Sequence, residues 1–192
     1  MNPVSTPAVI LTNPKYIHNI GGTIRACSCF GVDTLMWTGK RIQIDPESRE
    51  RIPREERMKG YRSVNWFHTD RPFDHLPPGA VPVAIELTES SEPMTTFEHP
   101  ENAVYVFGPE DGSVNQMMRR HCHRFVYIPT HHCVNLSAAV YMTLYDRRIK
   151  RQMAGLEPVL PLHEMLKEQR GTGYEPCELE TPTLAAMGWY GK

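Results

Sequence analysis

Residues 125–144, with the sequence FVYIPTHHCVNLSAAVYMTL, restrict the possible folds of this chain more than any other stretch. The β-branched apolar run Phe125–Ile128 predicts a buried strand, which ends at Pro129 because proline has no N–H to donate to a neighbouring strand. Apolar residues then recur at every fourth position: Leu136, Val140 and Leu144. This spacing predicts a helix with Asn135 or Ser137 as its N-cap, and the free N–H groups at its start suit a small polar ligand. An ordinary strand–helix junction without a ligand explains the same pattern.

The composition is that of an ordinary globular chain. Its 192 residues are enough for one domain with its own core, 40% of them are hydrophobic, and the formal net charge is −1. Any basic surface for a partner must therefore be local. The start MNPVSTPAV lacks the basic residues and apolar run of a signal peptide, and no apolar run is long enough to span a membrane. Five cysteines without regular spacing indicate reduced thiols, so we expect a cytoplasmic protein that does not bind membranes.

Short apolar segments separated by proline and glycine recur along the chain. Four of them predict further buried strands: residues 8–11, 34–38, 81–85 and 103–107. A helical pattern from Ile20 to Phe30 is closed by Gly31, and residues 114–120 can form one or two helical turns. Strands that alternate with helices predict an α/β fold with a mostly parallel sheet flanked by helices. Near the end of the chain, residues 161–170 can form one more helix, and residues 171–192 are expected to be a tail.

The segment of residues 40–71 is polar and crowded with charge. Its nine lysines and arginines outnumber its six acidic residues by three. It holds too few apolar residues to predict a core element. A solvated helix with loops and a surface that contacts a substrate are equally good interpretations.

Three short boxes of residues can carry chemistry. The first, HNIGGTIR, places Arg25 on the same helical face as Gly21 and Gly22, with Asn19 one turn earlier. Two glycines early in a helix cost roughly 1 kcal/mol each, which the close approach of another backbone, or of a phosphate and sugar, would justify. Tight packing of the helix on the sheet, with Arg25 in solvent, is the alternative.

The second box, FGPEDG, follows the predicted strand 103–107 directly. Ligands of open α/β sheets bind at the carboxyl ends of the strands. There Gly108 would allow a close backbone approach, and Glu110 would offer a fixed hydrogen-bond acceptor, although the same residues also make a simple turn. The third box is the organising stretch itself, with its candidate residues Ile128, Pro129, Cys133, Asn135 and Ser137.

The order and spacing of the three boxes resemble the three motifs of SpoU-type (TrmH-like) RNA methyltransferases of the SPOUT superfamily. The boxes here are Asn19…Arg25, Phe107…Gly112 and Ile128…Ser137, and the resemblance covers about residues 8–150. It implies a single catalytic domain over residues 1–152, with residues 153–192 as a C-terminal extension of unknown role.

The resemblance also implies a fold, a cofactor and partners. Its members have an α/β fold with a C-terminal trefoil knot, whose loops bind S-adenosyl-L-methionine. They form homodimers and methylate a ribose 2′-hydroxyl in RNA, for which tRNA is expected here before rRNA. The positions that would bind the cofactor are Ile85, Gly108, Ile128, Cys133 and Leu136. At Cys133 the family usually has serine, and a thiol is a weaker hydrogen-bond donor, although a backbone contact there would survive the change.

The candidate catalytic residues implied by the family are Arg25, Asn19, Glu110 and Asn135. A guanidinium is a poor base near neutral pH, so we expect Arg25 to grip a phosphate and fix the ribose. Asn135 and Glu110 would orient neighbouring groups.

Other functions stay open at this stage. A base methyltransferase on the same fold and a non-catalytic RNA-binding dimer are the alternatives. The clusters Cys27-x-Cys29, His121–His123 and His131–Cys133 lack the ligand spacing of structural zinc sites, so no metal is expected.

Overall fold

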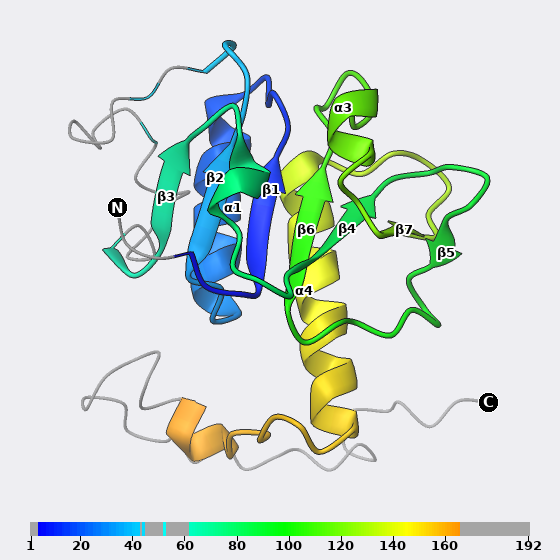
Figure 1. Cartoon of the computed structure of the whole chain (residues 1–192). Helices are drawn as coiled ribbons and strands as arrows, with labels where there is room; N and C mark the ends of the chain where they lie inside the picture. Colours follow the sequence, from blue (N-terminus) through cyan, green and yellow to red (C-terminus); the bar gives the residue numbers. More distant parts are fainter. Residues whose placement is uncertain (1–3, 43, 45–51, 53–61, 166–192) are drawn as a thin grey trace, which may run out of the picture.

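The computed structural model of the chain describes residues 4–42, 44, 52 and 62–165 (Figure 1). Its elements in chain order are β1 (Ala8–Leu11), α1 (Ile17–Cys29), β2 (Thr34–Trp37), β3 (Asn65–His68), the 3₁₀-helix η2 (Pro72–His75), β4 (Val81–Ile85), β5 (Glu92–Pro93), β6 (Ala103–Phe107), α3 (Gln116–Arg119), β7 (Arg124–Tyr127) and α4 (Leu136–Met153). The strands form one sheet in the order β3-β2-β1-β6-β4-β7-β5, and the neighbouring strands pair in parallel. The predicted α/β fold with a mostly parallel sheet is thus confirmed.

The five strands predicted from the sequence are all present. Three have the predicted bounds, β2 ends one residue early at Trp37, and β7 is shifted by one residue to Arg124–Tyr127. In the middle of the sheet, β1 and β6 are buried along their whole length. Strands that are covered on both faces have continuous apolar sequences, which is why pattern alone found them.

The expectation that residues 40–71 contain no core element is wrong. Part of this segment forms β3, which extends the sheet beside β2, and its Trp66 is buried and stacks on Trp37 with ring centroids 5.9 Å apart. Further apolar residues around it are also buried: Ile42, Ile44, Ile52 and Val64. Because β3 is an edge strand in which only Trp66 is buried, its sequence NWFH resembles a polar loop. Residues 43, 45–51 and 53–61 lie outside the described residues.

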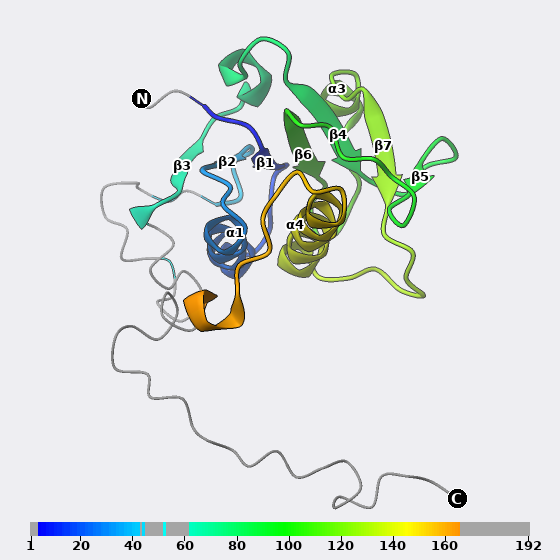
Figure 2. The same cartoon turned by 90° about the horizontal axis from the view of Figure 1, so that it is seen from below.

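Two layers of helix cover the sheet. Helices α1 and α4 lie side by side on one face, and η2 and α3 lie on the other (Figures 1 and 2). The larger apolar cluster sits under α1 and α4 and includes the fully buried Trp37, Tyr105 and Phe107. Burying a large apolar side chain contributes about 1.5–3 kcal/mol, so this face supplies most of the drive to fold.

The helix ends follow the sequence closely. Of the two candidate caps for α4, the structure has Asn135, whose Oδ1 accepts hydrogen bonds from the N–H groups of Ser137 (2.9 Å) and Ala138 (3.2 Å). Helix α1 ends before Gly31, whose φ of 67° is the left-handed conformation expected of a residue just past a helix. The residues expected to form one or two turns, 114–120, form the single turn of α3.

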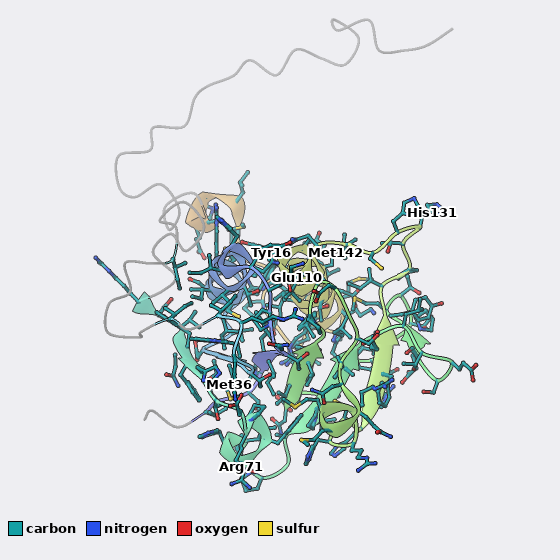
Figure 3. All side chains as sticks on the ribbon, turned by 90° about the horizontal axis from the view of Figure 1, so that it is seen from above. Tyr16, Met36, Arg71, Glu110, His131 and Met142 are labelled. Carbon is teal, nitrogen blue, oxygen red and sulfur yellow. The ribbon has the colours of Figure 1, made fainter. Side chains whose placement is uncertain are left out.

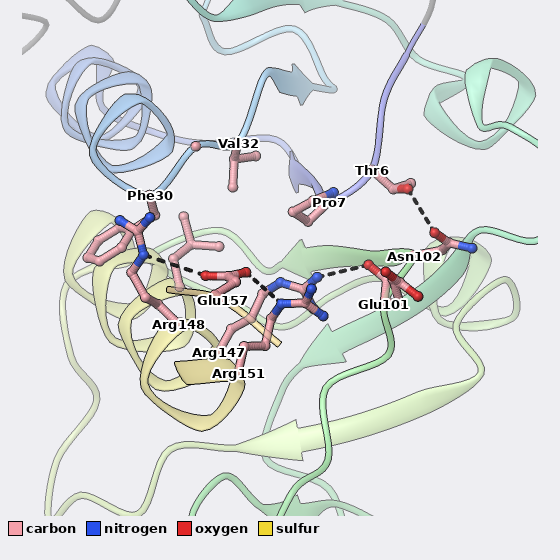
Figure 4. A pocket seen from close by; sticks show the side chains of 12 residues that line it. Thr6, Pro7, Phe30, Val32, Glu101, Asn102, Arg147, Arg148, Arg151 and Glu157 are labelled. Atoms are coloured by element: carbon pink, nitrogen blue, oxygen red, sulfur yellow. Dashed lines mark hydrogen bonds and ion pairs between the residues drawn. The ribbon is translucent and has the colours of Figure 1, made fainter. Parts of the chain in front are cut away.

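A cavity of about 230 Å³ lies at the amino ends of the strands, lined by three arginines of α4: Arg147, Arg148 and Arg151 (Figure 4). Arg147 is buried and donates to the carbonyls of Pro100 (2.6 Å) and Glu101 (2.8 Å). Glu157 accepts from Arg151 at 2.5 Å and lies 3.6 Å from Arg148, so it ties the segment after α4 to the helix end. The predicted helix at 161–170 begins at residue 162, and its second half lies outside the described residues.

A buried hydrogen-bonded chain connects β6 to α4. The Tyr105 hydroxyl lies 2.6 Å from Nδ1 of His99, and Nε2 of His99 lies 2.8 Å from Oδ2 of Asp146, which pairs with Lys150 at 2.7 Å. Because the carboxylate only accepts, Nε2 carries the proton and Nδ1 accepts from tyrosine. Burial lowers the pKa of His99 more than its hydrogen bond to Asp146 raises it, and burial raises the pKa of Tyr105 to about 12.

The lowered pKa of His99 should make stability depend on pH. Below the ordinary histidine pKa of about 6.5, the unfolded chain takes up a proton that the folded chain does not, so stability present at higher pH is lost as the pH falls, by at most about 1.4 kcal/mol per pH unit. Urea unfolding between pH 5 and 8 should therefore show that the stability difference between wild type and His99→Gln shrinks at acidic pH. His131→Gln, at an exposed histidine, should follow the wild type. A difference that stays constant with pH would contradict the expectation.

Candidate functional site

The site begins where the strand order reverses, between β1 and β6. Leu11 and Phe107 are register partners, so the chains after them leave the sheet side by side. Thr12 holds this point together, because its N–H (2.9 Å) and its hydroxyl (2.8 Å) both donate to the carbonyl of Phe107. The crevice outside the carboxyl ends at such a reversal is where open parallel sheets bind ligands.

Glu110 lies in the loop after β6 and is bound by the start of α1. Its carboxylate accepts hydrogen bonds from the backbone N–H groups of Lys15 (2.7 Å) and Tyr16 (3.2 Å) and from the side-chain amide of Asn19. Figure 3 shows Glu110 beside Tyr16 at this edge. Burial alone would raise the pKa of Glu110, but these hydrogen bonds outweigh it and hold the pKa below its usual value. The carboxylate therefore stays charged and is occupied by protein donors.

Asn135 joins the same group from the third box. Its Nδ2 donates to Oδ1 of Asn19 at 2.9 Å, while its own Oδ1 caps α4. Each asparagine thus accepts at one end and donates at the other, which neither an aspartate nor an alanine can do. We call Asn19, Glu110 and Asn135 the polar cluster; the structure brings these three predicted residues together from α1, the loop after β6 and the start of α4.

Helices α1 and α4 then run in parallel from this cluster. A Cβ at Gly22 would lie 2.9 Å from Cβ of Ser137, so glycine is required there by the close approach of α4. One turn on, Arg25 is exposed on α1, and its charge lowers the pKa of Tyr141, which burial raises overall. Arg25 lies six residues after Asn19, about 9 Å along the helix axis, so it faces solvent beyond the polar cluster.

The predicted cofactor loops also leave one edge of the sheet together. Ile85 of β4 is the register partner of both Phe107 of β6 and Val126 of β7, so the loops after these three strands are neighbours. The apolar side chains expected to contact the cofactor belong to the larger core cluster or pack against it: Ile85, Ile128 and Leu136. Cys133 is exposed.

Gly108 has a role that is visible in the backbone. A Cβ there would lie 2.9 Å from the nitrogen of Val114, so glycine lets the loop after β6 fold back on itself. The same N–H of Val114 donates to Oε2 of Glu86 at 2.7 Å, which joins this loop to the loop after β4. Sequence reasoning missed Glu86, although an acidic residue directly after a buried strand is a usable signal.

Within the described residues, no group of three or more histidine, cysteine or acidic side chains is placed to hold a metal ion. In the same part of the chain, no helix combines the length and the apolar character needed to cross a membrane.

A comparison with known protein families identifies the family to which the chain belongs. The SpoU rRNA Methylase family matches residues 6–145, which include all three boxes and the whole polar cluster. The chain belongs to this family. The SpoU-type assignment made from the three boxes is therefore confirmed.

Solved structures share the SpoU fold with the chain. A TrmH/SpoU tRNA modifying enzyme from A. aeolicus is 22% identical with a TM-score of 0.66, over 86% of this chain and 87% of that one. A structure that describes 2-OH methylation of C/U34 on tRNA is 21% identical with a TM-score of 0.62, over 77% and 96%. The SpoU methyltransferase AviRb from Streptomyces viridochromogenes, in complex with AdoMet, is 18% identical with a TM-score of 0.57, over 80% and 63%. No curated protein matches the chain.

Proposed function

We propose that this SpoU-family chain is an S-adenosylmethionine-dependent RNA methyltransferase that methylates a ribose 2′-hydroxyl, in tRNA before rRNA. The observation that carries the proposal is the polar cluster, which joins the first box to the other two at the strand-order reversal. The neighbours support it, since they include a tRNA modifying enzyme, a tRNA 2-OH methylation structure and an AdoMet complex.

The residues present fit the cofactor. Ile85, Ile128 and Leu136 would provide apolar contacts for an adenine, and the tight loop at Gly108 brings backbone polar groups to the same edge. At Cys133 the exposed thiol would be a weak donor, which leaves the backbone to make that contact. When bound, S-adenosylmethionine supplies a methyl group on a sulfonium, ready for in-line displacement.

The chain's own residues would position the RNA relative to the cofactor. Arg25 carries a permanent charge and a planar fork of donors, so it can hold a phosphate bidentately and fix the adjacent ribose. The polar cluster fixes the start of α1, and with it Arg25, relative to the cofactor loops. Correct positioning of two reactants can supply about 7–11 kcal/mol of a reaction barrier, and the 2′-hydroxyl that is methylated must also give up its proton to a base or to solvent.

The finer family features are part of the same proposal. We place the trefoil knot where the loops after β4, β6 and β7 meet, and the homodimer contact on the outer face of α1 and α4. The exposed Met142 (42%) and Tyr145 (58%) on α4 support that contact, since large apolar side chains in solvent are typical of interfaces. Residues 1–152 would be the catalytic domain and residues 153–192 an extension. The protein would work in the cytoplasm, where the four free thiols among the described residues would stay reduced.

The test is incubation with total RNA and isotopically labelled S-adenosylmethionine, followed by digestion to nucleosides and mass spectrometry. We expect a labelled 2′-O-methylnucleoside in the tRNA fraction. A labelled base would instead indicate a base methyltransferase. Absence of transfer and of cofactor binding by calorimetry, with RNA binding retained, would indicate a non-catalytic RNA-binding protein.

A further inference from the structure

A hollow of about 400 Å³ opens between the loop after β4 and helix α3. Its lining includes Gln116 and Arg119 of α3, and α3 lies on the side of the sheet away from α1 and α4 (Figure 2). Six residues line it: Thr88, Ser90, Gln116, Arg119, Arg120 and Phe125. Neither the polar cluster nor the proposed cofactor positions include any of them.

The two arginines of this hollow have no partner of opposite charge among the residues that the structure describes. Within the described part of the chain, the two guanidiniums make no ion pair and no hydrogen bond. This holds even for Arg119, which is half-buried. The nearby Arg124 behaves differently, since it holds Glu92 through two hydrogen bonds of 2.6 Å. A partly desolvated charge without a counter-ion is unfavourable, and an anionic ligand would remove that cost.

The described acidic residues of the adjoining loop do not neutralise the charge of Arg119 and Arg120. Glu86 accepts from the backbone of Val114, and the exposed Glu89 is not paired with either arginine among the described residues. The hydroxyls of Thr88 and Ser90 are 3.2 Å apart and Ser91 bonds Thr88 at 2.8 Å, so the loop is held in shape. The hydroxyl groups of Thr88 and Ser90 that line the hollow are thus held in place.

The donor set matches one ligand chemistry. Two planar guanidiniums with hydroxyl and amide groups suit phosphate oxygens, and the half-buried ring of Phe125 suits the apolar face of a sugar or base. The position also fits, because α3 follows the Gly108 loop directly and Thr88 follows the Ile85 loop. We propose that the hollow binds a backbone phosphate of the RNA substrate through Arg119 and Arg120. This inference rests on the proposed function, whose cofactor loops border the hollow.

The experiment compares the double variant Arg119→Ala/Arg120→Ala with the single variant Arg71→Ala. Arg71 is a matched control because it is exposed, already pairs with Asp74 at 3.2 Å, and lies at the periphery (Figure 3). With purified bulk tRNA as the probe, we expect the double variant to raise KM about 10-fold and to lower the slope of log affinity against log salt by about 1.5. We expect kcat within about twofold of wild type and unchanged calorimetric affinity for S-adenosylmethionine, because the arginines contact neither the cofactor nor the ribose.

Two further variants check the charge itself. Arg119→Lys/Arg120→Lys keeps both charges and should keep most of the salt slope, and Glu89→Gln should lower KM by removing a like charge beside the phosphate. A double alanine variant whose KM and salt slope equal those of Arg71→Ala overturns the inference, as does a loss confined to kcat or to cofactor affinity. If the wild type neither binds the cofactor nor methylates RNA, but the double alanine variant still loses RNA affinity relative to Arg71→Ala, the proposed function fails and the phosphate site stands.

Discussion

Replacing Arg25 with alanine is expected to lower kcat for RNA methylation by about 1,000-fold, while the affinity for S-adenosylmethionine stays unchanged. The size of the loss is that of removing one preorganised charged donor from a reaction centre. Arg25 is exposed on α1, and it is not one of the positions proposed to bind the cofactor. The whole effect should therefore appear in the use of RNA.

The measurements are single-turnover methylation of tRNA and calorimetry with the cofactor. Arg25→Lys is the matched variant, because it keeps the charge but loses the bidentate fork, and we expect an intermediate loss of about 30-fold. Weakened cofactor binding in Arg25→Ala would contradict the role given to this residue.

Replacing Glu110 with glutamine should cost both stability and activity. The carboxylate accepts three hydrogen bonds from the start of α1, and an amide at this position would turn one of its acceptors into a donor facing another donor. Losing a hydrogen bond to a charged group costs about 1.5–3 kcal/mol, so we expect the free energy of unfolding to fall by about 2 kcal/mol. We also expect kcat to fall about 100-fold, because α1 would no longer be held against the loop after β6.

Urea unfolding at pH 7 and methylation kinetics measure these effects, and Asp111→Asn is the control. Among the described residues, the neighbouring Asp111 pairs with two exposed cations, Arg41 at 2.7 Å and Lys15 at 3.6 Å, so its loss should change stability by less than about 1 kcal/mol. Since the pKa of Glu110 is lowered, its contribution is present above the ordinary glutamate pKa and is lost as the pH falls through the lowered value. Equal stability of the two variants at neutral pH would show that the polar cluster does not hold the helix.

The sheet could be predicted from the sequence where its strands are buried on both faces. Runs such as AVIL and AVYVF are continuous and apolar, whereas the edge strand β3 has two apolar residues between two polar ones and lies next to a charged segment. The two-residue β5 is too short to carry any pattern. Burial at the edge of a sheet depends on neighbours distant in the chain, which single-sequence periodicity does not report.

Part of the site could be predicted from the sequence. Residue types and the order of the boxes pointed to Asn19, Glu110 and Asn135, but their contacts depend on β1 pairing with β6, whose partners are far apart in sequence. Gly22 and Gly108 were identified as positions where other groups come close to the backbone. The structure shows that these groups are Ser137 at Gly22 and the backbone of Val114 at Gly108. The role of Glu86 and the hollow with Arg119 and Arg120, which have no partner among the described residues, became visible only once the loops were placed in space.

The hydrogen bond between Asn19 and Asn135 joins positions separated by 116 residues. Contacts this distant form late, because the chain between them must be ordered first. A partly synthesised chain that ends before Asn135 already contains the first two boxes, but it lacks the amide that joins the third box to Asn19. The polar cluster is therefore complete only when the start of α4 has docked against α1, after the first two boxes have already been synthesised.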